Sequence, residues 1–209
     1  SMRVAVINYG MGNLASVHRA LSDLGAEAYI AHSPDELAGA GRAILPGVGS
    51  FAEGMSRLND AGWSDMIRHL VLEKRTPVLG ICLGMQMLAS SGTEGGESAG
   101  LGLVTGRVRR LDELGCIERV PHVGWNAVRY VNDDPLFARI PDGSDFYFVH
   151  SFAFDESTVE SSAKAICDYG IKFVSVVRQG AAFGTQFHPE KSSKAGRQLL
   201  KNFLETAAC

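Results

Sequence analysis

The stretch Gly80-Ile81-Cys82-Leu83-Gly84-Met85-Gln86 decides how the rest of the chain is interpreted. A short apolar run before it predicts a buried strand, and residues 85–89 predict a helix. Gly-x-Cys-x-Gly has the spacing of the nucleophile elbow Gly-x-Ser-x-Gly, with a thiol in place of the hydroxyl. An elbow strains its backbone, so the positions two residues away on either side must lack bulk, and here they are glycines. The pattern predicts a strand, a sharp turn carrying Cys82, and a helix.

The predicted turn places Cys82 at the start of a helix, where the helix dipole favours a thiolate over a thiol. The free amides of that helix end, Leu83 N–H first among them, could donate to an oxyanion. The same residues also fit a structural cysteine packed between two glycines, because free cysteine is among the most buried residue types. The elbow alone leaves both interpretations open.

A second motif, Phe187-His188-Pro189-Glu190, follows a stretch with strand character at 181–186. A thiol nucleophile needs a base, and the base needs an acceptor that orients it. Residues two apart on an extended chain project to the same side, so His188 and Glu190 could form the base and its orienter. The same motif could also be a surface histidine that lies near a surface glutamate without a catalytic role. The order Cys, His, Glu across two strand ends favours the catalytic interpretation.

Composition places the chain among ordinary globular proteins. It has 209 residues, 45% hydrophobic and 21% charged, and we expect one domain over 1–209. The net charge of −3 gives no basic footprint for nucleic acid. We see no apolar run long enough for a membrane and no signal peptide. Ser1 before Met2 resembles the remnant of a cleaved tag.

The cysteines at 82, 116, 167 and 209 show no paired spacing, which indicates a reduced, cytoplasmic protein. The six histidines show no paired ligand spacing, so we expect no metal site. We also expect no cofactor.

The first half of the chain alternates predicted strands and helices, which indicates an α/β fold. We expect strands at 3–8, 26–31, 42–45 and 77–81, and helices at 14–24, 51–61 and 63–75. The glycine-rich segment 91–102 reads as a mobile surface loop with no core of its own. Short strands dominate the second half, at 104–111, 123–131, 145–149, 163–168, 171–178 and 181–187, before a closing helix near 193–206. The expected architecture is an open mixed, mainly parallel sheet flanked by helices, with a β-rich second half.

Two glycine loops lie at the ends of predicted strands. Gly10-x-Gly12-x-x-Ala15 mimics a dinucleotide fingerprint, but the following strand ends in 31–33, Ala-His-Ser, without the acid that the fingerprint needs. The loop Pro46-Gly47-Val48-Gly49 could bring a second oxyanion donor, Val48 or Gly49 N–H, beside the elbow. It could equally be an ordinary glycine turn.

Together, the elbow with Gln86, the Pro-Gly-x-Gly loop and His-Pro-Glu resemble the three signatures of the class I (triad) glutamine amidotransferases, in that order. The resemblance spans nearly the whole chain and implies a flavodoxin-like glutaminase fold. It also implies a set of roles: a catalytic triad of Cys82, His188 and Glu190, an oxyanion hole from Val48 and Leu83, and glutamine contacts from Gly49, Gln86, His150, Ser151 and Phe152.

Within this family the sequence is similar to the imidazole glycerol phosphate synthase branch, above all in the hexapeptide 121–126, Pro-His-Val-Gly-Trp-Asn. This resemblance implies that ammonia from glutamine passes to a cyclase subunit, a (β/α)₈ barrel, in histidine biosynthesis. It further implies a heterodimer whose interface includes Asn8, Gly12, Asn13, Trp125 and Asn126. Without the resemblance, an indole in a strand would usually belong to the core.

Two other functions compete with this one. A stand-alone cysteine hydrolase of the same fold would act without a partner and would leave the Trp125 hexapeptide unexplained. A nucleotide-binding module would use Gly10 and Gly12, against the missing acid after the second strand.

Overall fold

The computed structural model describes residues 2–161 and 163–207, so Ser1 and Cys209 lie outside the described residues. Five strands form a parallel half-sheet in the order β2-β1-β3-β4-β13. Their bounds are β1 Arg3–Ile7, β2 Glu27–Ala31, β3 Arg42–Leu45, β4 Val78–Ile81 and β13 Ala182–Thr185. The predicted α/β first half is confirmed.

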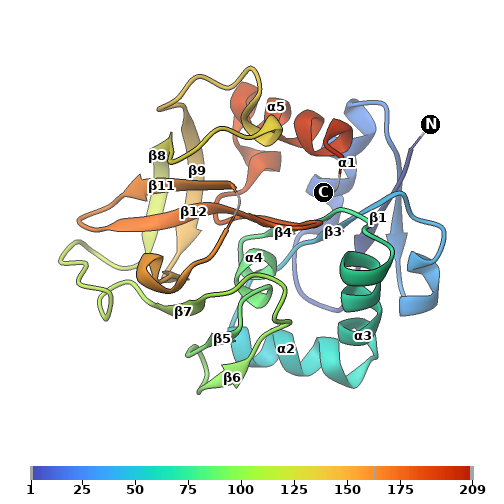
Figure 1. The fold of residues 1–209 in the computed structure, drawn as a ribbon, viewed down its shortest axis with the longest axis horizontal. Helices are drawn as coiled ribbons and strands as arrows, with labels where there is room; N and C mark the ends of the chain where they lie inside the picture. The colour runs from blue at the N-terminus through green and yellow to red at the C-terminus, as the bar shows by residue number, and fades with distance from the viewer. Residues whose placement is uncertain (1, 162, 208–209) are drawn as a thin grey trace.

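Helices cover both faces of this half-sheet because its strands are apolar on both sides. Val4 and Val6 of β1 pack in the cluster that holds the buried side chains of α1 (Leu14–Asp23) and α5 (Ser193–Glu205). Ala5 and Ile7 face the cluster containing α2 (Phe51–Asp60) and α3 (Trp63–Arg68), which a π-helical turn, η2 (His69–Glu73), continues. Figure 1 shows α1 and α5 on one side of the sheet and α2 and α3 on the other. Helix α4 (Leu83–Met87) follows β4 directly.

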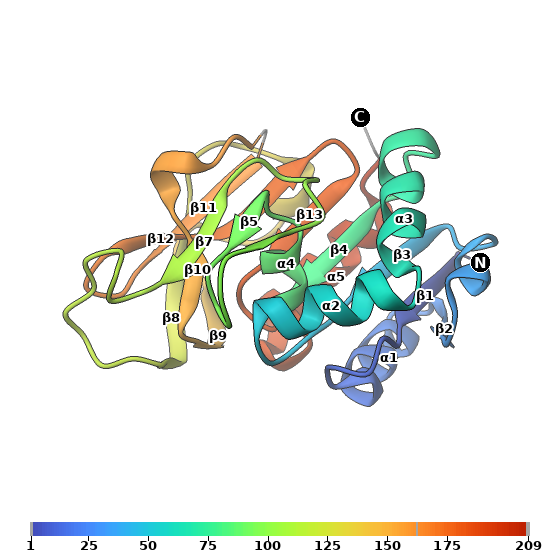
Figure 2. The ribbon, with the colours of Figure 1, turned by 90° about the horizontal axis from the view of Figure 1, so that it is seen from below.

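The second half of the chain extends the sheet with antiparallel strands beyond β13. In both views these strands gather at the end of the molecule opposite α1 and β2 (Figures 1 and 2). Their bounds are β7 Arg107–Arg110, β8 His122–Tyr130, β9 Asp145–His150, β10 Phe152–Phe154, β11 Ala163–Asp168 and β12 Lys172–Gln179. The predicted β-rich half is confirmed, although the short strand β10 was not expected. Single 3₁₀ turns lie at η1 Pro34–Leu37, η3 Pro135–Phe137, η4 Glu156–Thr158 and η5 Pro189–Lys191.

The segment 91–102 differs from its prediction as a loop with no core of its own. It forms a small hairpin of β5 (Ser91–Gly92) and β6 (Ser98–Ala99), and β5 pairs with β7. A Cβ on Gly92 would lie 2.7 Å from the Phe51 ring, so this glycine allows close packing on α2 rather than free motion. Leu101 is buried in the same core. The loop interpretation is therefore wrong.

The strand ends decide where a site can form. Because β1, β3, β4 and β13 are parallel, their carboxyl ends meet at one edge of the sheet. Ligands of open α/β sheets bind at this edge. The segments that leave it begin at Asn8, Pro46, Cys82 and Gln186.

Within the described residues, no helix combines the length and the apolar character needed to cross a membrane.

Candidate active site

The elbow has the strained geometry that the sequence predicts. Cys82 adopts φ 55° and ψ −112°, a conformation that side-chain-bearing residues rarely take. A Cβ on Gly84 would lie 1.8 Å from the Leu45 carbonyl oxygen, and one on Gly80 would lie 2.5 Å from the Gly84 carbonyl. Both glycines are therefore required for β4 to turn into α4. The turn leaves Cys82 at the start of α4, mostly buried but opening onto a cavity.

His188 and Glu190 lie beside the elbow because β13 pairs in parallel with β4. His188 Nδ1 and Glu190 Oε2 are 3.2 Å apart, and both side chains are almost fully buried. The backbone N–H of His188 donates to the Tyr147 carbonyl, and the buried Ser192 hydroxyl donates to the His188 carbonyl. The turn after β13 is thus fastened to β9, and the predicted pair is brought together.

The electrostatics of His188 favour its charged form. Burial by itself lowers its pKa, but the neighbouring side chains of Cys82 and Glu190 outweigh burial and raise the pKa to about 9. Its Nε2 atom is buried and has no hydrogen-bond partner within the described ranges. In the charged form both ring nitrogens carry a proton, so Nε2 holds the proton that Cys82 gives up when it becomes a thiolate.

The two predicted oxyanion donors, the Leu83 and Val48 amides, do not both face the cavity in this structure. Leu83 N–H donates to the Gly47 carbonyl at 3.2 Å. The Gly47 carbonyl and the Val48 N–H are opposite ends of one trans peptide, so the Val48 N–H points away from that position. The Tyr9 hydroxyl, nearly buried, donates to the Pro46 carbonyl at 2.8 Å and holds the loop in place. In this structure the Gly47 carbonyl of this loop therefore takes up the hydrogen bond of the Leu83 amide.

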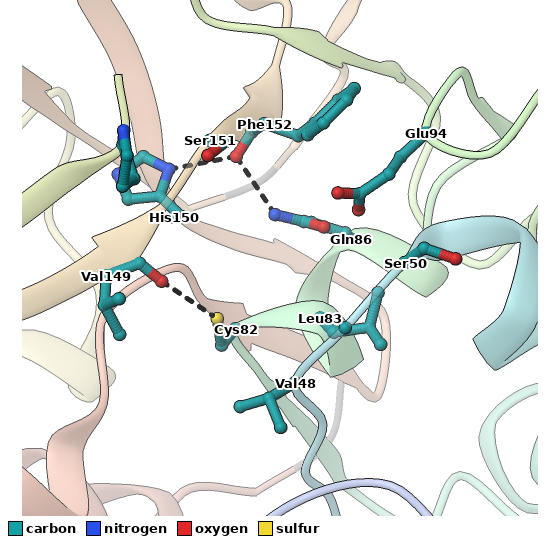
Figure 3. A pocket seen from close by; sticks show the side chains of 12 residues that line it. Val48, Ser50, Cys82, Leu83, Gln86, Glu94, Val149, His150, Ser151 and Phe152 are labelled. Atoms are coloured by element: carbon teal, nitrogen blue, oxygen red, sulfur yellow. Dashed lines mark hydrogen bonds between the residues drawn. The ribbon is translucent and has the colours of Figure 1, made fainter. Parts of the chain in front are cut away.

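A cavity of about 450 Å³ opens above Cys82. The predicted substrate contacts Gly49, Gln86, His150, Ser151 and Phe152 all line it, together with Val48 and Leu83. Gln86 Nε2 donates to the Phe152 carbonyl at 3.0 Å, as Figure 3 shows. The structure brings these residues together, while their contact with glutamine stays a prediction.

Two residues at the site were missed by sequence reasoning. Glu94 lines the cavity, and its carboxylate accepts a hydrogen bond from Phe51 N–H at the start of α2. Burial raises the pKa of Glu94, opposed by that bond and by Arg110. Gln186 is fully buried, and its Nε2 donates to Cys82 Sγ at 3.7 Å. The only sequence signals were an acid inside the glycine-rich segment and an amide just before Phe187.

The residues predicted for a partner interface differ in exposure. The Trp125 side chain on β8 is 53% exposed and stacks edge-on with Tyr147, so it does not belong to the core. Asn126 instead points inward and donates to the Asp168 carbonyl. Asn13 caps α1, and Asn8 accepts a hydrogen bond from Gly10 N–H. Gly12, at φ 118°, packs its backbone against Gly47. The N-terminal loop therefore lies directly on the loop that occupies Leu83.

Within the described residues, no group of three or more His, Cys, Asp or Glu side chains is placed to hold a metal ion.

Known proteins resemble this chain over nearly its full length. Residues 5–207 match the family model "Glutamine amidotransferase class-I". The chain is 47% identical over 202 residues to "Imidazole glycerol phosphate synthase subunit HisH" of Moorella thermoacetica, covering 97% of this chain and 94% of that protein. It is 48% identical to the subunit of the same name from Symbiobacterium thermophilum, covering 96% and 92%.

Two solved structures share the fold. A crystal structure of a glutamine amidotransferase matches with a TM-score of 0.75 at 23% identity, covering 97% of each chain. The structure of PurLQS from Thermotoga maritima matches with a TM-score of 0.74 at 20% identity, covering 98% of each chain. The strained cysteine elbow, the buried His-Glu pair and the family match over residues 5–207 agree, and the chain belongs to the class-I glutamine amidotransferase family.

Proposed function

We propose that this chain is the glutaminase subunit of imidazole glycerol phosphate synthase. It hydrolyses glutamine to glutamate and ammonia and passes the ammonia to a cyclase subunit. The observation that carries the proposal is Cys82, held at φ 55° at the floor of the cavity beside the buried pair of His188 and Glu190. The nearly full-length likeness to subunits of this name supports it.

The proposed reaction starts from the charged pair in which His188 Nε2, which has no other partner within the described residues, holds the Cys82 proton and the sulfur is a thiolate. The sulfur attacks the side-chain amide carbon of glutamine and forms a carbon–sulfur bond. His188 returns the proton to the leaving nitrogen, so ammonia departs and a thioester remains. His188 then takes a proton from the water that attacks the thioester. The carbon–sulfur bond breaks, glutamate leaves, and the proton remains on His188 beside the Cys82 thiolate, as at the start. Glu190 keeps the imidazole oriented through both steps.

The tetrahedral intermediates need donors that the resting loop does not offer. For Leu83 N–H to reach an oxyanion, the Gly47 carbonyl must leave it. Rotating the Gly47–Val48 peptide would free Leu83 and turn the Val48 N–H toward the site in one movement. Gly47 is one of the two residues whose dihedral angles change in this rotation, and it lacks the side chain that would resist the change. We therefore expect low activity in the isolated chain.

Substrate recognition in this proposal uses charge as well as shape. Figure 3 shows the Glu94 carboxylate and the Gln86 amide pointing into the same cavity. Since Gln86 directs its nitrogen to Phe152, its oxygen is left for a donor from the substrate. A carboxylate and an amide oxygen together suit the ammonium group of a free amino acid.

An exposed apolar stripe at the mouth of the cavity suits a partner subunit. Val123 and Trp125 lie two apart on β8, opposite Val149 and Tyr147 on β9, so all four share one face. Val149 also lines the cavity with Val48, and the exposed fractions are 56% for Val123, 53% for Trp125 and 48% for Val48. We infer that the (β/α)₈ cyclase docks on this stripe and on the loop containing Asn8, Gly12 and Asn13.

Cys82, Cys116 and Cys167 are free thiols in this structure. This supports, as part of the proposal, a reducing compartment such as the cytoplasm.

The experiment is ammonia release from glutamine by the chain alone, then with the matching cyclase and its nucleotide ligand. Low activity alone and a large increase in the mixture are expected. Full activity alone, unchanged by the cyclase, would favour a stand-alone hydrolase.

Trp125→Ala should weaken the complex more than it lowers the melting temperature of the isolated chain, since its indole is exposed. An unweakened complex with a large loss of melting temperature would restore a core role for Trp125.

A further inference from the structure

A chain of hydrogen bonds runs behind the cavity from β8 to the sulfur of Cys82. Its fixed point is the Phe152 carbonyl, because a peptide oxygen only accepts. His150 Nδ1 and Gln86 Nε2 both lie within hydrogen-bond distance of it, at 2.9 and 3.0 Å (Figure 3). Both must therefore donate, and this fixes the direction of every other bond in the chain.

On the histidine side, a proton on His150 Nδ1 leaves its Nε2 as an acceptor. His122 Nδ1 lies 2.9 Å from that Nε2 and must donate. His122 Nε2 is then an acceptor for Asn126 Nδ2 at 3.3 Å, which also donates to the Asp168 carbonyl. Burial lowers the pKa of His122 to about 4 and that of His150 to about 3, so both rings are neutral, as this order requires.

On the nucleophile side, the second hydrogen of Gln86 Nε2 goes to Gln186 Oε1 at 3.1 Å. The oxygen of Gln186 is thereby assigned, and its Nε2 must be the atom that faces Cys82 Sγ at 3.7 Å. Gln186 is fully buried, and its backbone N–H donates to the Ser175 carbonyl at 2.8 Å. Its amide is held as a donor to the sulfur.

The contact of the sulfur with the Val149 carbonyl favours the thiol rather than the thiolate. The Cys82 thiol donates to the Val149 carbonyl at 3.7 Å, a bond that only the protonated sulfur can make. Once the proton has moved to His188, the Gln186 amide faces the sulfur as a second donor beside the protonated His188 ring. A hydrogen bond to a charged group is roughly twice as strong as one between neutral groups, so this donor favours the anion.

We propose that Gln186 is a further catalytic residue, whose side-chain N–H stabilises the Cys82 thiolate, and that the order of bonds through Gln86, Phe152, His150 and His122 keeps that N–H directed at the sulfur. This inference rests on the proposed function, since it takes Cys82 as the nucleophile. It adds a group to the triad that acts on the reacting sulfur before glutamine is attacked.

The test is the rate at which iodoacetamide alkylates Cys82 in the isolated chain as a function of pH, followed by mass spectrometry of the Cys82 peptide. Gln186→Met keeps the length of the side chain and removes the donor. Gln186→Asn keeps an amide but withdraws it by one methylene, which gives a second variant if the first does not fold. Each should raise the midpoint pH of alkylation by about one unit and slow the reaction about ten-fold at neutral pH.

Thr185→Val is the matched control. Thr185 is fully buried on the same strand, and its hydroxyl donates to the Phe187 carbonyl rather than to the sulfur. It should keep the wild-type profile. Wild-type profiles in both Gln186 variants would overturn the role of Gln186 and leave the glutaminase intact. A wild-type Cys82 that does not react would instead overturn the proposed function, and this inference with it.

Discussion

The site has a nucleophile half, which is already arranged for reaction, and an oxyanion half, which is not. In the nucleophile half, Cys82 sits in its strained turn, and His188 and Glu190 are paired and buried beside it. In the oxyanion half, the Gly47 carbonyl occupies the Leu83 amide, and Tyr9 holds the preceding carbonyl. The chain thus assembles its nucleophile on its own, while its charge-stabilising donors await a rotation of one peptide. The loop that blocks the Leu83 amide is separate from the elbow that carries Cys82, so its orientation can be changed without altering the nucleophile.

Removing the nucleophile should have the largest effect. Cys82→Ala should reduce glutamine hydrolysis by about 10⁴-fold or more, with or without the cyclase, since no thioester can form. The melting temperature should stay close to that of the wild type because alanine meets the same backbone strain at φ 55°. Ammonia-release kinetics and a thermal melt check both statements. Normal turnover in this variant would remove Cys82 from the nucleophile half.

Substitution of His188 should reduce activity more than substitution of Glu190, which orients it. His188→Ala should cost nearly as much activity as Cys82→Ala, while Glu190→Ala should cost about ten- to a hundred-fold less, since orientation matters less than proton transfer. The measurement is kcat for each variant in the complex with the cyclase. The reverse order would contradict their assigned roles.

The raised pKa of His188 should appear in the pH dependence of stability. A histidine whose folded-state pKa is about 9 instead of 6.5 stabilises the fold fully below about pH 6.5 and loses that contribution as pH rises through about 9. The loss should be on the order of 3 kcal/mol at most. Denaturant unfolding across this range should show the decline in the wild type and a weaker one in His188→Ala. Equal slopes would contradict a charged His188 in the resting site.

The smallest expected effect lies in the oxyanion half. Tyr9→Phe removes the hydroxyl that donates to the Pro46 carbonyl, so the loop should rotate more readily. The isolated chain should gain a few-fold in glutaminase activity and lose about 1 kcal/mol of stability. Arg57→Ala, which alters a largely exposed neighbour of the N-terminal loop, serves as a control for general loosening. Lower stability without any gain in activity would mean that Tyr9 does not restrain the loop.

Local steric rules made the nucleophile half predictable from the sequence. Gly80, Gly84 and the strand before Cys82 encode the elbow within a few residues, and the His188–Glu190 spacing encodes the second element. Glu94 and Gln186 were not predictable in the same way. Their partners lie 43 and 104 residues away, and no spacing signals such contacts.

The state of the oxyanion loop could not be predicted either. Pro46-Gly47-Val48-Gly49 identifies a loop able to supply a donor, but glycine permits either orientation of the Gly47–Val48 peptide. The orientation follows from tertiary contacts of Tyr9 and Leu83. For the same reason, the residues alone assign Trp125 to the core. The family resemblance placed it at an interface, and the pairing of β8 with β9 shows the face on which it is exposed.

The most direct test of the central claim is detection of the covalent intermediate. The complex with the cyclase is mixed with glutamine, quenched in acid during turnover, digested and analysed by mass spectrometry. The account predicts a glutamyl group on the peptide that carries Cys82, absent from Cys82→Ala. Turnover of glutamine with no adduct on Cys82, or with the adduct on another residue, would contradict it.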